Sequence, residues 1–143
     1  MTLLALGLNH KTAPIDIRER VSFGPDIVVG ALRSLAEQAG AGEAVIVSTC
    51  NRTEVYCAGD ALDGDGLQRW LSRFHGLDAA LVRPYVYSYR DKEAVRHLFE
   101  VAAGLDSMIL GEPQILGQVK NAFQTAQNAG AIGKLLGRLF QCT

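Results

Sequence analysis

The sequence predicts an α+β fold, a ferredoxin-like split βαβ arrangement in which a four-stranded antiparallel sheet has helices on one face and a carboxy-terminal helical extension. Four short runs rich in apolar and β-branched residues are typical of strands. Two segments with apolar residues at helical spacing lie between the first and second run and between the third and fourth. The order strand, helix, strand, strand, helix, strand then gives this sheet under the rule that crossovers are right-handed.

The strands are expected at residues 3–8, 45–47, 54–58 and 84–89. The first helix begins at Gly24-Pro25-Asp26, because proline suits the first helical position and an acidic residue suits the positive end of the helix dipole. Gly40 and Gly42 end this helix. The second helix ends at His75-Gly76, and its apolar face consists of Leu67, Trp70, Leu71 and Phe74.

Three further helices are expected after the sheet. Asp91 can cap the first of them and Gly104 can end it. The next helix begins at Glu112-Pro113 and ends before Gly130. The last one runs from about Ile132 to the end of the chain.

Size and composition exclude several classes of protein. A chain of 143 residues can bury a core without a disulfide framework, since domains cluster at about 100–150 residues. Its formal net charge of −1 lacks the basic excess of a dedicated nucleic-acid binder, so any polyanionic partner must be held locally. Three cysteines without framework spacing, and no amino-terminal signal pattern, predict a cytoplasmic location. No apolar run reaches the ~20 residues that span a bilayer, so no membrane partner is expected.

Cofactor motifs are missing from the sequence. No Gly-x-Gly-x-x-Gly follows a predicted strand, so no dinucleotide cofactor site is expected in this chain. The histidines and cysteines lack zinc-ligand spacing, and Asp63-Gly64-Asp65-Gly66 lacks the remaining ligands of a calcium loop. No metal site is therefore predicted.

Cys50 lies in a polar segment, residues 48–54, between the second and third predicted strands. A free cysteine usually packs as a small apolar residue, and this interpretation fits Cys57 and Cys142, which lie in apolar surroundings in the sequence. The polar neighbours of Cys50 at the end of a strand instead favour an accessible thiol. Cys50 is therefore the candidate nucleophile.

Two other segments are unusually polar for their positions. His97 lies at the edge of an apolar helix face, and Ser107 follows the end of that helix. Gln114 and Gln118 are one turn apart on one face, just inside a helix start, where their amides could bind a small polar ligand. Taken singly, such residues are more often satisfied or solvated than functional.

Taken together, three segments closely resemble the glutamyl-tRNA reductase family: residues 7–14, 48–54 and 107–120. The resemblance covers essentially the whole chain, at the spacing of that family's amino-terminal catalytic domain. It implies an excised fragment, because the family continues into an NADPH-binding domain and a helical dimerisation domain. NADPH is then the cofactor of the full-length enzyme only.

The resemblance implies the first step of tetrapyrrole (porphyrin and heme) biosynthesis, in which glutamyl-tRNA is reduced to glutamate-1-semialdehyde. Cys50 matches the family nucleophile, which attacks the aminoacyl ester and forms a glutamyl thioester. His97 matches a histidine important for activity. Positions matching substrate contacts are Thr49, Cys50, Asn51, Arg52, Ser107, Glu112, Pro113, Gln114 and Gln118.

Further expectations follow from the resemblance. Arg52 is assigned to the side-chain carboxylate of the substrate glutamate, since a guanidinium can pair bidentately with it. Residues 1–90 would form the sheet subdomain that carries the nucleophile, and residues 91–143 a helical subdomain that completes the substrate site. The expected partners are glutamyl-tRNA, a second copy of the full-length chain through the missing helical domain, and a downstream aminotransferase.

Two other function classes remain open at this point. The chain could be a cysteine esterase or hydrolase that acts without hydride transfer, and the isolated fragment would show at most this activity. It could also be a non-catalytic ferredoxin-like ligand-binding module with a structural Cys50. Alkylation of Cys50 tests the last of these alternatives: a buried packing thiol does not react with a mild alkylating agent, whereas an accessible nucleophile does.

Overall fold

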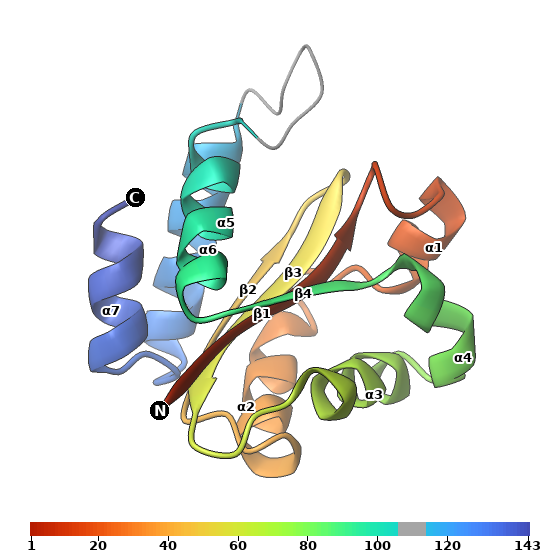
Figure 1. The fold of residues 1–143 in the computed structure, drawn as a ribbon, viewed down its shortest axis with the longest axis horizontal. Coiled ribbons are helices and arrows are strands. Elements are labelled where there is room, and N and C mark those ends of the chain that lie inside the picture. The colour runs from red at the N-terminus through yellow and green to blue at the C-terminus, as the bar shows by residue number, and fades with distance from the viewer. Residues whose placement is uncertain (106–113) are drawn as a thin grey trace.

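The computed structural model describes residues 1–105 and 114–143. Its four strands are β1 (Thr2–Asn9), β2 (Glu43–Ser48), β3 (Arg52–Gly59) and β4 (Tyr87–Arg90). They form one antiparallel sheet in the order β2-β3-β1-β4, as Figure 1 shows. This is the split βαβ topology, so the predicted fold class is confirmed.

Helices cover both faces of the sheet. The predicted pair, α2 (Val28–Gln38) and α3 (Gly64–Phe74), packs on one face. The helical extension packs on the other and consists of α5 (Lys92–Ala102), α6 (Ile115–Asn128) and α7 (Lys134–Gln141) (Figure 1). Because both faces are covered, β1 and β3 are buried almost throughout. This explains the nearly continuous apolar character of β1, whereas β3 also buries the polar residues Arg52, Thr53 and Glu54. The division into two subdomains stays a prediction.

Three short elements were not predicted. Helices α1 (Ile15–Arg20) and α4 (Ala79–Val82), and a 3₁₀ turn (Arg83–Tyr85), lie in segments treated as connections or strand. β4 accordingly begins at Tyr87, because Pro84 lies in the 3₁₀ turn and has no backbone N–H to offer a strand.

Two helix starts also differ from expectation. α2 begins at Val28, after a turn in which the backbone N–H groups of Ile27 and Val28 donate to the carbonyl of Gly24. Asp91 precedes α5 but makes no side-chain cap; its Oδ1 accepts a hydrogen bond from the backbone N–H of Leu3 at 3.1 Å. Asp91 thus ties the start of α5 to β1. The expected helix start at Glu112-Pro113 lies outside the described residues.

The three cysteines occupy different environments. Cys57 in β3 is fully buried, as predicted for a packing residue, and Cys50 is exposed. The prediction that Cys142 packs in the core is wrong: it follows the end of α7 and is exposed. Its apolar neighbours Leu139 and Phe140 face inward, whereas Cys142 lies beyond the last turn.

None of the described helices is long and apolar enough to cross a membrane.

Candidate active site

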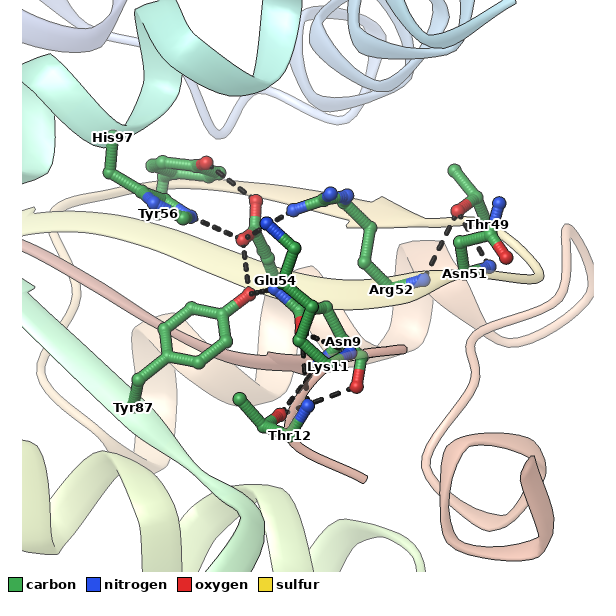
Figure 2. Close-up of polar contacts among 10 residues, drawn as sticks. All are labelled: Asn9, Lys11, Thr12, Thr49, Asn51, Arg52, Glu54, Tyr56, Tyr87 and His97. Carbon is green, nitrogen blue, oxygen red and sulfur yellow. Dashed lines mark hydrogen bonds and ion pairs between the residues drawn. The ribbon is translucent and has the colours of Figure 1, made fainter. Parts of the chain in front are cut away.

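Cys50 lies at the tip of the turn that joins β2 to β3. Thr49 shapes this turn: its backbone N–H donates to the carbonyl of Arg52 at 2.8 Å. Its hydroxyl oxygen accepts hydrogen bonds from the backbone N–H groups of Asn51, at 3.1 Å, and Arg52, at 3.2 Å (Figure 2). These bonds close the turn on itself, so Cys50 is left at its outer edge and is exposed.

A cleft of about 440 Å³ opens beside Cys50, here called the Cys50 cleft. One wall comes from α1 and the segment that follows it, and Gln118 of α6 lines it as well. The segment after α1 is held against the end of β2, because the backbone N–H of Phe23 donates to the Ser48 hydroxyl at 2.9 Å. The lining residues are Ile15, Arg18, Glu19, Ser22, Phe23, Gly24, Ser48, Thr49, Cys50 and Gln118.

A second group of polar side chains lies inside the protein, around Glu54 of β3. We call it the Glu54 centre; its members are Arg52, Glu54, Tyr56, Tyr87 and His97. The Tyr56 hydroxyl donates to Oε1 of Glu54 at 2.7 Å, and Nη1 of Arg52 lies 3.2 Å from Oε2. Tyr87 and Nε2 of His97 also hydrogen-bond to Oε2, as Figure 2 shows. One carboxylate thus receives donors from β3, β4 and α5.

The charges in the Glu54 centre are almost wholly buried, since Arg52 is 0 % and Glu54 1 % exposed. Burial is the largest single influence on the pKa of Glu54 and raises it, but His97, Arg52 and Tyr87 together outweigh burial and lower this pKa. Burial, and then the Glu54 charge, raise the pKa of Tyr56 well above its usual value. Glu54 is therefore ionised and accepts only, so Nε2 of His97 carries the proton of their hydrogen bond.

His97 is fixed from three sides. Its side chain is buried, Nε2 is bonded to Glu54, and the Tyr89 ring stacks on it with centroids 4.6 Å apart. The Tyr87 ring meets it edge-on at 5.3 Å. Among the contacts of the described residues, none joins His97 to Cys50.

Comparison with known proteins gives the family. Residues 6–143 match the family described as "Glutamyl-tRNAGlu reductase, N-terminal domain". The glutamyl-tRNA reductases of Shewanella baltica and Shewanella oneidensis are 56% identical over 144 residues, which is 100% of this chain and 34% of theirs. The chain belongs to the glutamyl-tRNA reductase N-terminal domain family. It spans about a third of the length of these curated relatives.

The solved structures agree with this assignment. The glutamyl-tRNA reductase from Methanopyrus kandleri superposes with a TM-score of 0.73 and 34% identity, over 97% of this chain and 31% of that one. The family match begins at residue 6, within β1, and includes the other three strands and the described parts of the helical extension through α7. Both the Cys50 cleft and the Glu54 centre therefore lie within the glutamyl-tRNA reductase domain.

The candidate residues fall into separate places within this domain. Thr49, Cys50 and Gln118 line the Cys50 cleft, whereas Arg52 and His97 meet at Glu54. Asn51 stands in the turn, where its carbonyl accepts from the backbone N–H of His10 at 2.8 Å. Gln114 precedes the first turn of α6 and is exposed, and it does not line the Cys50 cleft. Ser107, Glu112 and Pro113 lie outside the described residues.

Sequence reasoning missed Glu54, the residue that connects Arg52 to His97. A signal was present: Arg52, Glu54 and Tyr56 are polar or amphipathic residues at every second position of one strand, and so they share one face of it. Such a row on one face of a covered strand indicates polar groups that satisfy one another. Tyr87 of β4 also belongs to this set. Arg18, which lines the Cys50 cleft, gave no signal in the sequence.

Proposed function

We propose that this chain is the catalytic domain of a glutamyl-tRNA reductase and that Cys50 accepts the glutamyl group from glutamyl-tRNA. One observation carries the proposal: in a member of this family, an exposed thiol stands at the tip of a hydrogen-bonded turn beside a cleft of about 440 Å³. A packing cysteine has the environment of Cys57 instead, fully buried in the sheet. Exposure and an open cleft are what an attacking thiol needs.

The proposed step is an acyl transfer. The Cys50 thiolate attacks the ester carbonyl carbon, the new carbon–sulfur bond forms, and the bond from carbon to the ribose oxygen breaks. The electron pair of that bond stays on the ribose oxygen, which takes up a proton as the tRNA leaves. The glutamyl thioester that remains on Cys50 is an activated acyl group.

Arg52 is proposed to pair with the side-chain carboxylate of the glutamyl group, which would set the preference for glutamate over glutamine. Its guanidinium is fully buried against Glu54, so a carboxylate reaches it only when the covering groups move. Any substrate group that does so must be small. Thr49, Asn51, Gln114 and Gln118 are proposed as further contacts, together with Ser107, Glu112 and Pro113.

His97 is proposed as the second catalytic residue, which orients or polarises the ester carbonyl or transfers the leaving-group proton. Because Nε2 is committed to Glu54, this role falls to Nδ1. Loss of a group in such a role usually costs about 10²–10⁴-fold in rate.

The remaining parts of the proposal rest on family membership. When bound to the full-length enzyme, NADPH supplies the hydride that converts a thioester to glutamate-1-semialdehyde. Among the described residues, no strand-to-helix turn carries the Gly-x-Gly-x-x-Gly pattern of a dinucleotide site, so no hydride step is assigned to them. Homodimerisation, an aminotransferase partner and a cytoplasmic location are proposed on the same basis.

The test is to trap the acyl group. The purified chain is mixed with glutamyl-tRNA at neutral pH, quenched in acid and analysed by intact mass spectrometry. We expect a glutamyl adduct on the wild-type chain, none on Cys50→Ser, and an undiminished adduct on Cys142→Ser, which removes the other exposed thiol. Slow release of free glutamate would reflect hydrolysis of the thioester. Neither adduct nor glutamate, from a chain whose Cys50 still alkylates readily, would exclude Cys50 as the acyl acceptor.

A further inference from the structure

Arg18 of α1 has no part in the function proposed above, yet it lines the Cys50 cleft. Its side chain is half-buried, and Nη1 donates to the backbone carbonyl of Cys50 at 3.0 Å. Nε of the same guanidinium is buried and has no hydrogen-bond partner. An arginine has five N–H donors in a fixed fork, so Arg18 is anchored to the nucleophile's turn with donor capacity left over.

The charge of Arg18 is also uncompensated by the part of the chain that the structure describes, where no carboxylate forms an ion pair with it. Arg52 is the contrasting case, because its guanidinium is fully buried and paired with Glu54. A half-buried cation beside an open cleft can meet a group attached to a large molecule. A fully enclosed one can meet only a small group.

The substrate of the proposed function carries two anions near the reacting ester: the side-chain carboxylate of the glutamyl group and the 5′-phosphate of the terminal nucleotide. The phosphate is separated from the ester by a single ribose and continues into the body of the tRNA. The planar fork of a guanidinium group matches the oxygens of a phosphate as well as those of a carboxylate, so geometry does not distinguish the two anions. Accessibility therefore decides between the two arginines.

We propose that Arg18 binds the 5′-phosphate of the terminal nucleotide and thereby holds the ester carbonyl over Cys50. This inference rests on the proposed function. It adds a local phosphate contact to a chain whose net charge of −1 gives no general attraction for RNA. Arg18 acts here as a binding and positioning residue. The hydrogen bond from its Nη1 to the backbone carbonyl of Cys50 couples the position of the phosphate to that of the thiol.

The test uses two small substrates that differ by one phosphate: 2′(3′)-O-glutamyl-AMP, with a 5′-phosphate, and 2′(3′)-O-glutamyl-adenosine. The rate of glutamyl transfer to Cys50 is followed by intact mass spectrometry below saturation. In the wild-type chain we expect the phosphate to raise this rate. Arg18→Gln should lower the rate about 10–100-fold with the phosphate substrate, the size of one or two lost charge-assisted hydrogen bonds, and change it little with the nucleoside.

Two variants serve as controls. Arg20→Gln removes an exposed arginine from the same short helix, outside the Cys50 cleft, and should leave both rates unchanged. Arg18→Lys keeps the charge without the fork and should recover part of the phosphate effect. If Arg18→Gln fails to fold, the wild-type rate ratio between the two substrates and the Arg18→Lys variant still test the inference.

The outcomes separate the two levels of the argument. An equal loss with both substrates would assign Arg18 to the glutamyl carboxylate or to the Cys50 turn and overturn the phosphate contact. An unchanged rate with both would remove Arg18 from substrate binding altogether. In either case the proposed acyl transfer to Cys50 stands. If the wild-type chain forms no adduct with either small substrate or with glutamyl-tRNA, the proposed function itself fails, and this inference fails with it.

Discussion

The Glu54 centre and the Cys50 cleft both depend on β3 and the turn before it, but they are opposite in physical character. In the centre a buried carboxylate is surrounded by donors from three elements, and its partner Arg52 is fully enclosed. At the cleft a thiol is exposed, and the nearby Arg18 is half-buried and forms no ion pair with a carboxylate of the described residues. A satisfied interior rigidifies, whereas unsatisfied groups at a surface are available to a ligand.

A buried, stabilising ion pair and an exposed thiol thus lie within a few residues of each other in the sequence. The turn at Cys50 is closed by its own hydrogen bonds through Thr49, so it needs nothing from the thiol. Substitutions in the Glu54 centre should therefore lower the free energy of unfolding, in addition to any effect on catalysis through Arg52 and His97. Substitution of the exposed Cys50 should alter reactivity in a protein of nearly unchanged stability.

The largest expected effect is on thiol reactivity. Burial raises the pKa of Cys57 to about 12, so its thiolate fraction at neutral pH is on the order of 10⁻⁵, and the folded protein shields it as well. Iodoacetamide at pH 7 should modify Cys50 and Cys142 in the native chain and leave Cys57 unmodified over the same time. Peptide mapping by mass spectrometry measures this, and all three should react in urea. Native-state labelling of Cys57 at the rate of Cys50 would contradict the buried assignment.

The next effect compares Glu54→Gln with Cys50→Ser. Removing the carboxylate breaks the buried ion pair between Glu54 and Arg52, a loss that typically costs about 3–5 kcal/mol of folding free energy. Cys50→Ser alters an exposed side chain and should stay within about 0.5 kcal/mol. Urea unfolding followed by circular dichroism gives both values. Equal stabilities for the two variants would mean that the Glu54 centre does not support the fold.

The fold could be predicted from the sequence because its signals are local. β-branched runs and helical spacing mark the four strands and five of the helices within windows of about 5–15 residues. Helices α1 and α4 escaped because six and four residues are too few to show a period. The apolar surroundings of Cys142 were misleading, since what decides its exposure is the helix end, and helix ends are poorly marked in sequence.

The site was only partly predictable for a different reason. Cys50 stands out from its immediate neighbours, and its matching motif gave the family. The bond between Glu54 and His97 instead joins residues 43 positions apart, and the bond between Arg18 and Cys50 joins residues 32 positions apart. Such pairings depend on the sheet register and on how α1 and α5 pack, neither of which a single sequence specifies.

A smaller change in stability tests how tightly β1 packs against Glu54 in the neighbouring strand β3. Gly7 of β1 pairs with Glu54, and a Cβ at Gly7 would lie 2.7 Å from Cγ of Glu54 and against the carbonyl of Thr53. Gly7→Ala should therefore cost about 1–3 kcal/mol, as overpacking usually does. Gly30→Ala is the matched control, because nothing lies within 4 Å of a Cβ there and alanine is the better helix residue by about 0.5–1 kcal/mol. Urea unfolding should show opposite signs for the two variants, and a Gly7→Ala variant as stable as the wild-type chain would contradict the tight packing of β1 against Thr53 and Glu54.

The last prediction concerns the free energy of unfolding at acidic pH. The pKa of Glu54 is lowered in the folded protein from 4.5, so its contribution to stability is present above that value and is lost as the pH falls through the folded pKa. Burial, the largest single influence, raises this pKa, and the hydrogen bonds and charges of His97, Arg52 and Tyr87 together lower it by more. Unfolding free energies measured between pH 7 and pH 3 should fall more steeply for the wild-type chain than for Glu54→Gln, so the two curves converge in acid. Glu100→Gln removes a more exposed carboxylate on α5 and should keep the wild-type slope. A constant gap between wild type and Glu54→Gln would mean that Glu54 keeps its ordinary pKa, and the Glu54 centre would then owe its stability to shape rather than to charge.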